Sequence, residues 1–412
     1  MMIKSIFSHV IIGMILAGVG IVPQANAQTM SLDGKLQVSE GRIGGLVSAT
    51  GNRPIVETTL AKIKRLEGDG PGVWSYEWRL IGEYYESLGD SFAKNGEIEK
   101  ALKKYHGAVK LYGMGYMPGN YTPSERKSYM RFRDIAYKIN NHLAHPFVLV
   151  KIPFEGKEII THLYKPKGVK KPPLVLYTGG TDGSKEGSNS TTQTLAAEGI
   201  AVVTFDLAGT GESMDWFARP DSHKLHKRIL DFFEESGDYD YSRVGLIGGS
   251  FGGYYAVRMA AEDKRLKAAI NHCGLVHSAF QVPLEEMPRV LHSPSGAMIS
   301  SAVRRMGFDP ELLSDPAKLD PKTQSEFNSV AKSFSLIEQG VVGSGEKTIH
   351  IPLLIVNGTR DTVVSKSDIK LVEEAASNSE TWLMGLAPHC APNYMNSAHP
   401  DMMTWLVEKL NE

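Results

Sequence analysis

The segment Gly248-Gly249-Ser250-Phe251-Gly252 contains the residues best suited to covalent chemistry. It follows an apolar run at 244–247 and precedes a stretch at 253–260 that is suited to a helix. A serine on a sharp strand-to-helix turn projects above the edge of a sheet, where its hydroxyl can attack an acyl carbon. Glycines two residues before and after the serine are needed because side chains there would collide. We therefore predict that Ser250 is a nucleophile.

A serine hydroxyl is a weak nucleophile at neutral pH, so it needs a base, and the base needs an acid that orients it. For a serine on this kind of turn, the acid and then the histidine follow later in the chain. Asp361 comes just after the apolar run 352–356, whereas the run 266–270 ends in a segment without a carboxylate. Asp361 is the predicted acid. Its alternative role is helix capping, which Ser365 and Ser367 could perform instead.

The base should follow the last strand and precede the closing helix. His389 lies between the apolar run 381–386 and a helical stretch at 402–410. His399 is the competing histidine, but it lies close to the start of the closing helix, where a surface or capping role is expected. We predict that His389 removes the proton from the Ser250 hydroxyl.

Attack on a carbonyl places negative charge on its oxygen, which backbone N–H groups can stabilise. The N–H of Phe251, at the start of the predicted helix, is one expected donor. A second donor should come from the glycine-rich segment 178–183, which follows another predicted strand. Either Gly180 or Thr181 could present it.

From residue 146 onward, short apolar runs alternate with amphipathic stretches. This alternation predicts an α/β fold with a doubly wound, mostly parallel sheet that is covered by helices on both faces. A helical insertion at about 274–345, divided by prolines, interrupts the pattern and is expected to form a lid over the site. The runs expected to form strands are 147–153, 158–164, 174–178, 200–205, 244–247, 266–270, 352–356 and 381–386.

Residues 28–145 have a helical pattern and are predicted to form an all-helical N-terminal cap domain ahead of a catalytic domain at 146–412. Trp74 and Trp78 begin a series of apolar residues at three- and four-residue steps. The spacing that follows is that of a single helical hairpin, which cannot bury its own faces and should pack on a neighbour. We expect the two tryptophans in the helix core, with a place in the substrate pocket as the alternative.

Residues 1–27 have the features of a secretory signal peptide. Lys4 precedes an apolar run at 10–22, and Ala25-Asn26-Ala27 forms a cleavage site. The apolar run is shorter than the roughly 20 residues that span a bilayer, although an uncleaved anchor is the alternative. Cleavage after Ala27 would leave a periplasmic or secreted protein without a membrane segment.

The composition argues against several classes of protein. With 45 Lys and Arg against 46 Asp and Glu, the chain lacks the basic excess of a nucleic-acid-binding protein. Two spaced histidine pairs, His142/His145 and His223/His226, lack a third ligand in frame. We therefore expect neither a metal nor another cofactor, and a small-molecule ester or acyl compound as the partner. A homodimer is left open.

The chain has two cysteines, Cys273 and Cys390, and both fall at predicted strand ends near the expected site. Two cysteines are too few for a disulfide scaffold or a four-cysteine zinc module. An oxidising compartment would permit a disulfide between them. The sequence leaves open whether they pair.

Residues 146–412 resemble the α/β-hydrolase fold. The runs 178–186 and 205–213, and the segment 389–393 before a helix that contains Trp405, are similar to a subfamily with an N-terminal helical domain. That subfamily includes fermentation/respiration-switch esterases, fungal polyketide-shortening hydrolases and dihydroxypseudooxynicotine hydrolase. The resemblance implies Ser250 as nucleophile, Asp361 as acid and His389 as base.

The resemblance leaves the bond that is cleaved open. Some members of the subfamily cleave carbon–carbon bonds next to a ketone and use an extra carboxylate from the lid. Glu285 and Glu286 lie in the matching insertion, where a solvated helix face is the other interpretation. Most members are intracellular, so the predicted signal peptide is a departure from the subfamily.

We expect a secreted or periplasmic serine hydrolase that cleaves a carboxylic ester through an acyl-enzyme. Ketone, amide or peptide hydrolysis and acyl transfer are the enzymatic alternatives, because they use the same triad. The non-enzymatic alternative is a binding protein that uses the helical hairpin and retains a vestigial hydrolase domain.

Overall fold

The computed structural model describes residues 28–412 except 31–35, 39, 118, 120 and 294–295. The predicted signal peptide, residues 1–27, lies outside the described residues. Within the described ranges, no helix combines the length and the apolar character that a membrane crossing requires.

An eight-stranded sheet forms the centre of the larger part of the chain, with the strand order β10-β9-β8-β7-β5-β6-β4-β3. Every pairing from β10 across to β6 is parallel, whereas β4 pairs antiparallel with both β6 and β3. The mostly parallel sheet predicted from the sequence is therefore confirmed. The strands are β3 (Phe147–Phe154), β4 (Lys157–Tyr164), β5 (Pro173–Thr178), β6 (Ala201–Phe205), β7 (Asp240–Gly249), β8 (Leu266–His272), β9 (Leu353–Gly358) and β10 (Ser379–Met384).

The strand β7 differs most from its predicted range, 244–247, because it begins at Asp240 and ends at Gly249. The strand β10 is displaced by two residues at each end and stops at Met384 rather than at Leu386. Leu386 has a φ of 59°, in the left-handed region that a strand cannot contain. The chain therefore turns earlier than its apolar pattern indicates.

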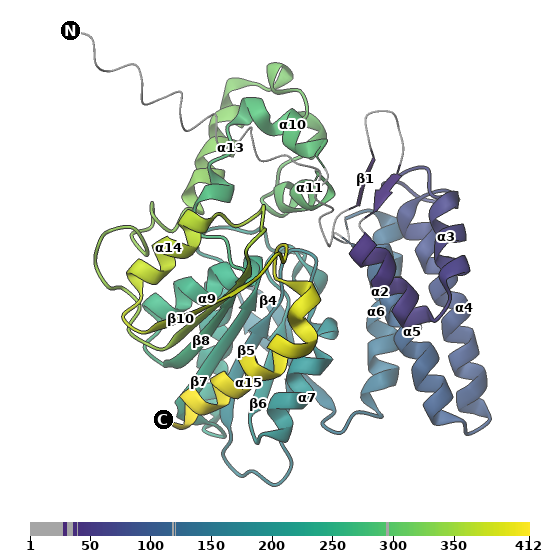
Figure 1. The fold of residues 1–412 in the computed structure, drawn as a ribbon, viewed down its shortest axis with the longest axis horizontal. Helices are drawn as coiled ribbons and strands as arrows, with labels where there is room; N and C mark the ends of the chain where they lie inside the picture. The colour runs from purple at the N-terminus through teal and green to yellow at the C-terminus, as the bar shows by residue number, and fades with distance from the viewer. Residues whose placement is uncertain (1–27, 31–35, 39, 118, 120, 294–295) are drawn as a thin grey trace.

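Helices cover both faces of this sheet (Figure 1). The helices α7 (Asn189–Ala197) and α15 (Met395–Asn411) contribute to one apolar layer, whereas α8 (Lys224–Ser236), α9 (Phe251–Glu262) and α14 (Lys366–Ala375) contribute to the other. Successive strand residues point to opposite faces. Val202 packs in the layer of α15, and its neighbour Val203 packs in the layer of α8. Both residues are 0% exposed, as expected for a strand that is covered on both sides.

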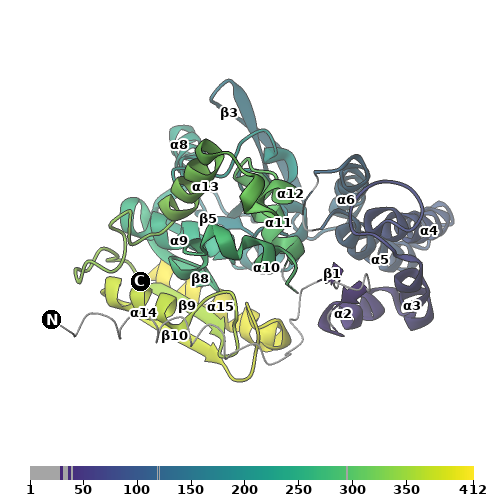
Figure 2. The ribbon, with the colours of Figure 1, turned by 90° about the horizontal axis from the view of Figure 1, so that it is seen from above.

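The lid insertion between β8 and β9 is helical, as predicted. It contains α10 (Met287–Leu291), α11 (Gly296–Arg305), α12 (Pro310–Leu313) and α13 (Pro321–Ser333). Prolines stand in the first turn of α10, α12 and α13, where the missing N–H has no helical partner to lose. These helices have their own apolar cluster, which includes Met287 and Phe327, and they lie over the sheet in the view from above (Figure 2).

The N-terminal region consists mainly of α2 (Glu40–Thr50), α3 (Arg53–Lys62), α4 (Trp74–Lys94), α5 (Ile98–Tyr116) and α6 (Pro123–Asn140), which lie beside the sheet (Figures 1 and 2). It also contains a short antiparallel pair, β1 (Gln28–Met30) and β2 (Leu36–Val38), which the all-helical prediction did not include. Three-residue strands are too short to show an alternating pattern.

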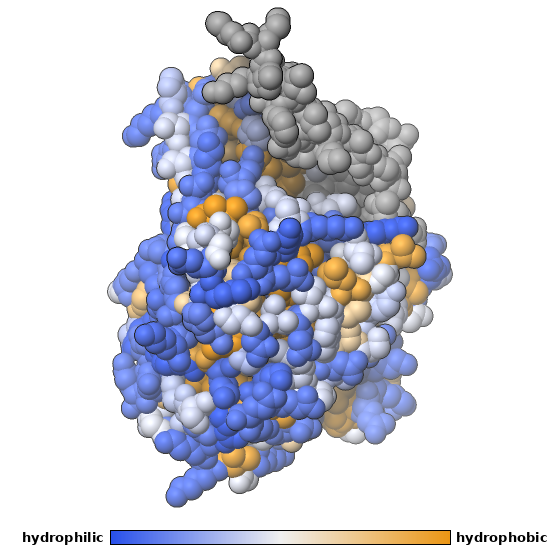
Figure 3. Space-filling model, turned by 60° about the vertical axis from the view of Figure 1, so that its left-hand side comes forward, coloured by the Kyte–Doolittle hydropathy of each residue, from blue (hydrophilic) through white to orange (hydrophobic). Residues whose placement is uncertain are grey.

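The helices α4 and α5 form the predicted hairpin. Gly82 and Gly89 on α4 lie directly against the rings of Tyr112 and Tyr105 on α5, where any side chain would collide. Trp74 and Trp78 are 1% and 0% exposed, so their predicted position in the helix core is confirmed. Among the residues that the structure describes, hydrophilic ones predominate on the face shown in Figure 3, with smaller hydrophobic groups between them.

Candidate active site

The turn between β7 and α9 places Ser250 above the carboxyl end of the sheet. Ser250 has a φ of 50° and a ψ of −118°, a combination that L-residues rarely adopt. A side chain at Gly248 would overlap the carbonyl of Gly252, and one at Gly252 would lie 2.6 Å from the carbonyl oxygen of Thr178. The two glycines therefore permit the strained turn, as the spacing predicts.

His389 and Asp361 lie beside this serine, in the loops that follow β10 and β9. The Ser250 Oγ lies 3.0 Å from Nε2 of His389, and Nδ1 of His389 lies 2.8 Å from Oδ2 of Asp361. A carboxylate oxygen only accepts, so Nδ1 carries the hydrogen and Nε2 is left to accept from the serine hydroxyl. The three side chains form one continuous hydrogen-bonded series.

Asp361 is held on both of its carboxylate oxygens. Its Oδ1 accepts the N–H groups of Val363 and Val364, at 2.7 and 3.0 Å. Burial acts to raise the pKa of Asp361, but the hydrogen bond and charge of His389 and the two backbone N–H groups outweigh it and lower the pKa below its usual value. The carboxylate is therefore ionised at neutral pH and fixed in orientation.

Asp361 does not cap the helix that follows it, and His399 does not lie beside Ser250. The helix α14 is capped by Ser365, whose side chain accepts the N–H of Asp368, so Asp361 is not its capping residue. His399 lies within α15, where its Nε2 is 2.9 Å from Oγ1 of Thr191. This position engages His399 away from Ser250.

The loop after β5 closes the other side of the serine. A Cβ atom added to Gly180 would lie 2.6 Å from Cβ of Ser250, so the backbone of this loop lies directly against that serine. Thr181 and Phe251 both line the cavity above Ser250. The loop and the start of α9 thus bring the predicted oxyanion donors to the same place.

A cavity of about 510 Å³ opens above Ser250 and His389, between the sheet and the lid. Most of its lining is apolar, and much of that lining comes from lid residues such as Val282, Met298 and Phe327. Three arginines, Arg289, Arg305 and Arg360, and the acidic Asp182 add charge to the wall. The cavity is large enough for a small organic substrate.

The two lid carboxylates, Glu285 and Glu286, lie outside the cavity above Ser250. Glu286 instead accepts a hydrogen bond from Nε of Arg289 at 2.7 Å, on an exposed part of the lid. The solvated helix face is therefore the better description of both residues.

The sequence model of the family described as Esterase FrsA-like matches residues 63–411 of this chain. The chain belongs to the FrsA-like esterase family. Esterase FrsA of Photobacterium profundum is 24% identical over 83% of this chain and 78% of its own length. Hydrolyase poxO of Penicillium oxalicum is 30% identical over 50% of this chain and 53% of its own length, so the chain spans about half of that relative.

Solved structures confirm the α/β-hydrolase fold of this FrsA-like protein. The 2,6-dihydroxy-pseudo-oxynicotine hydrolase has a TM-score of 0.68 at 20% identity and covers 89% of this chain and 95% of its own. AbyA5 has a TM-score of 0.65 at 20% identity over 83% of this chain and 90% of its own. The family and these relatives together support a hydrolase.

A buried ion cluster that the sequence motifs did not predict supports the Gly180 loop of this FrsA-like protein. The Nζ of Lys185 lies 2.8 Å from carboxylate oxygens of Glu186, Asp206 and Glu212. Burial acts to lower the pKa of Lys185, but the three carboxylates raise it well above its usual value. The two family-like runs, 178–186 and 205–213, meet in this cluster. The acidic and basic residues of these two runs were the feature of the sequence that could have predicted the cluster.

The N-terminal helices contact the same loop. The hydroxyl of Tyr129, on α6, lies 3.3 Å from both Nζ of Lys185 and Oε1 of Glu186. The hydroxyl of Tyr116, on α5, donates to the carbonyl of Asp182 at 3.3 Å. The helical region thus contacts the loop that carries the expected oxyanion donors.

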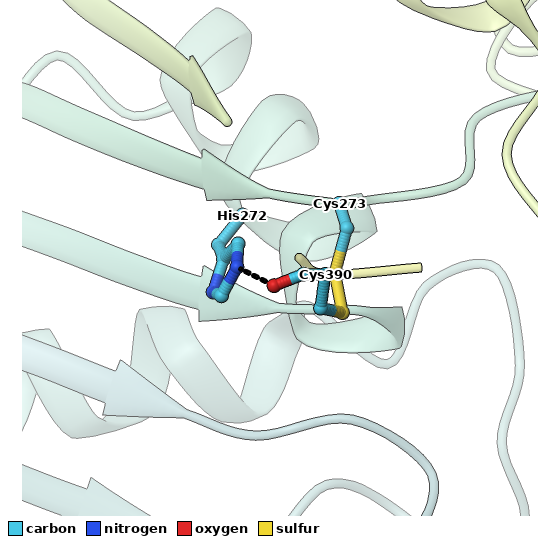
Figure 4. Close-up of side chains that lie close together, drawn as sticks. All are labelled: His272, Cys273 and Cys390. Atoms are coloured by element: carbon cyan, nitrogen blue, oxygen red, sulfur yellow. Dashed lines mark hydrogen bonds between the residues drawn. A yellow bond between two sulfur atoms is a disulfide. The ribbon is translucent and has the colours of Figure 1, made fainter. Parts of the chain in front are cut away.

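Cys273 and Cys390 form a disulfide, with Cα atoms 5.0 Å apart, which answers the question left open by the sequence (Figure 4). In the described part of the chain, these two cysteines and His272 are the one group of three residues whose types and spacing could hold a metal ion. Their sulfurs are bonded to each other and are therefore not thiolate ligands. His223 instead lies 3.1 Å from Glu262, and His226 is buried against Phe205.

Proposed function

We propose that this FrsA-like protein is a serine hydrolase that cleaves a carboxylic ester through an acyl-enzyme. The observation that carries the proposal is the continuous series of hydrogen bonds from Ser250 through His389 to Asp361, beneath a cavity that can hold a substrate. This arrangement activates a serine hydroxyl and orients its base.

In the proposed reaction, the Oγ of Ser250 attacks the ester carbonyl while Nε2 of His389 takes its proton. The oxyanion forms near the N–H of Phe251 and an N–H of Gly180 or Thr181, which stabilise its charge. The imidazolium then gives the proton to the leaving alcohol, and an acyl-enzyme remains. His389 next takes a proton from water, whose oxygen attacks the acyl carbon. The bond to Oγ of Ser250 then breaks, the acid leaves, and the imidazolium returns its proton to Oγ.

The cavity favours a small-molecule ester with an apolar acyl or alcohol group. Its wall includes Leu275, Val303 and Met306, and burial of an apolar group against such residues contributes about 25 cal/mol per Å². Ketone hydrolysis is the less favoured alternative, because Glu285 and Glu286 do not reach the cavity.

The location that we propose is the periplasm or the exterior of the cell. The predicted signal peptide is one argument, and the Cys273–Cys390 disulfide is the second, because disulfides persist in oxidising compartments and are rare in the cytosol.

Labelling with a fluorophosphonate probe tests the nucleophile. We expect the wild-type protein and a Ser397→Ala control, changed on an exposed part of α15, to label, and Ser250→Ala to remain unlabelled. Turnover of p-nitrophenyl esters, aryl ketones and aminoacyl amides then tests the bond. Ketone hydrolysis without ester hydrolysis would contradict the proposal, and a wild-type protein that neither labels nor turns over any of them would support the binding-protein alternative.

A further inference from the structure

We propose that the Cys273–Cys390 disulfide positions the catalytic histidine, so that the oxidised protein is the active form and reduction lowers its turnover. The inference rests on the proposed serine hydrolase function. Cys390 directly follows His389, and Cys273 directly follows the strand β8, so the disulfide joins the histidine loop to the sheet (Figure 4).

The loop that carries His389 has a strained backbone. Leu386, Cys390 and Ala391 have φ values of 59°, 60° and 46°, which residues other than glycine rarely adopt. Such conformations persist only where the surrounding structure holds them. The loop therefore needs attachment from outside its own sequence.

Hydrogen bonds from β8 and from the segment after β9 supply part of that attachment, including one from the N–H of Leu386 to Oγ1 of Thr359 at 2.9 Å. The N–H of Arg360 donates to the carbonyl of Ala387 at 2.9 Å, and Nε2 of His272 lies 2.8 Å from the carbonyl oxygen of Cys390. A carbonyl oxygen only accepts, so Nε2 of His272 carries the hydrogen. The disulfide is the covalent link among these contacts, and it holds the residue next to His389.

The end of β8 also forms hydrogen bonds with the segments that carry the other two triad residues. The N–H of Ser250 donates to the carbonyl of His272 at 2.8 Å, and the N–H of Cys273 donates to the carbonyl of Val356 at 2.7 Å. Val356 belongs to β9, which leads to Asp361. Linking Cys390 to Cys273 therefore sets His389 relative to both the nucleophile and the acid.

Burial supports the role of His272 as a neutral donor. Burial is the main cause that lowers the pKa of His272 to about 4, and the neighbouring His389 acts in the same direction. His272 therefore stays neutral at the pH of an esterase assay, so its hydrogen bond to Cys390 does not change with protonation in that range. The effect of reduction then reports on the covalent link and not on a titration of His272.

The disulfide can be reached by a small reductant, because Cys390 lines the cavity above Ser250. A thiolate of dithiothreitol attacks the Cys390 sulfur, and the Cys273 sulfur leaves as a thiolate that takes a proton. The second thiol of the reagent then attacks the mixed disulfide and releases the Cys390 thiol. Two electrons pass from the reagent, which ends as a cyclic disulfide, to the protein, which ends with two thiols.

The test compares oxidised and reduced wild-type protein at a temperature where circular dichroism shows both to be folded. Dithiothreitol reduces the protein in the presence of EDTA, since His272 and the two freed thiols lie within 4.8 Å of one another and could bind a metal. Thiols are counted before and after. We expect kcat for a p-nitrophenyl ester and the rate of fluorophosphonate labelling to fall at least about 10-fold, with KM within about threefold, because small displacements of a catalytic group lower turnover strongly.

The double variant Cys273→Ser/Cys390→Ser provides the matched control. We expect it to have the low kcat of the reduced protein and no response to dithiothreitol, while reoxidation restores the wild type. Reduced protein with two free thiols and a kcat within twofold of the oxidised value would overturn the proposal, as would unfolding on reduction. Absence of labelling in the oxidised protein would instead contradict the serine hydrolase function itself.

Discussion

At the scale of single residues, the position of Ser250 depends on glycines that leave space for backbone. The turn forces Ser250 to a φ of 50°, and Gly248 and Gly252 accept carbonyl groups where a side chain would stand. Gly180 meets the serine from the opposite side. A side chain at Gly180 should disturb Ser250 more than the fold around it, because it would meet the serine side chain, whereas side chains at Gly248 and Gly252 would meet backbone.

The substitution Gly180→Ala tests this close approach. The added methyl group would lie 2.6 Å from Cβ of Ser250, so either the serine or the oxyanion loop must move. We expect kcat/KM for an ester to fall about 100-fold, the loss typical of a displacement near 1 Å. Gly187→Ala is the matched control, because nothing lies within 4 Å of its added methyl group, and it should keep the wild-type activity. If Gly180→Ala retained its activity, the loop could move to accept the methyl group without a loss of kcat/KM, which would contradict this prediction.

Asp361 orients His389, and Asp361→Asn should remove this function with little change in shape. An asparagine can still accept the N–H groups of Val363 and Val364, but its amide nitrogen cannot accept the hydrogen of His389 Nδ1. We expect kcat to fall about 10,000-fold with a normal circular dichroism spectrum. Asp401→Asn, on an exposed part of α15, serves as the control. A loss below tenfold would argue against Asp361 as the acid.

At the scale of elements, the Lys185 cluster connects three segments that are distant in the sequence. Lys185 follows β5, Asp206 follows β6, and Tyr129 lies on α6. The side chains of Lys185 and Asp206 are 0% exposed, so their charges depend on one another. The cluster therefore joins the helical region and the sheet beneath the loop of Gly180.

Lys185→Met should destabilise the protein strongly, because it leaves Asp206 and Glu186 as buried carboxylates without their cation. Loss of one partner from a buried ion pair costs about 3–5 kcal/mol. Urea unfolding measures the free energy of unfolding for this variant and for Lys170→Met, an exposed control that should change it by less than about 0.5 kcal/mol. A change below about 1 kcal/mol in Lys185→Met would show that the cluster is not a stabilising joint.

At the scale of the whole molecule, two buried histidines make the stability of the fold depend on pH. His162 and His226 are 0% and 1% exposed, and the described structure shows no hydrogen-bond partner for their ring nitrogens. The ring of His162 stacks on Phe147 with centroids 3.7 Å apart, and His226 lies between Phe205 and Tyr255. Burial lowers the pKa of each histidine to about 3, so the folded protein holds both in the neutral form.

The unfolded chain binds protons to these histidines below about pH 6.5, while the folded protein does not, so their contribution to stability is lost as the pH falls from about 6.5 toward about 3. At pH 5.5 the loss is about 1.4 kcal/mol for each histidine. The free energy of unfolding should therefore decrease between pH 8 and pH 5.5. We expect this decrease to be smaller by about 1.4 kcal/mol in His226→Leu. The exposed control His350→Asn should show the same decrease as the wild type.

The difference between variant and wild type is the quantity to measure. Glu125, whose pKa burial raises to about 7, acts in the opposite direction over part of this range, because its folded form binds the extra proton. An identical pH dependence in wild type and His226→Leu would contradict the neutral buried state of His226.

Local features of the sequence were sufficient to predict the mostly parallel sheet, the turn at Ser250 and the candidate acid and base. The glycine spacing around Ser250 specifies a turn through sterics between near neighbours, and alternation of apolar and amphipathic runs specifies a doubly wound sheet through solvent exposure. The loops that follow β9 and β10 follow from chain order, so Asp361 and His389 could be chosen before their distances to Ser250 were known. Boundaries were less well determined, as the early end of β10 shows.

Contacts between distant segments were decided only by the tertiary structure. Cys273 and Cys390 are separated by 117 positions, and their pairing depends on how the histidine loop folds back onto β8. The Lys185 cluster, the approach of Gly180 to Ser250 and the size of the cavity depend in the same way on the relative placement of strands, helices and lid. The sequence by itself determined which residues are capable of the chemistry, because residue type and short-range sterics are local. Which of them meet, and what surrounds them, is set by the packing of the whole chain.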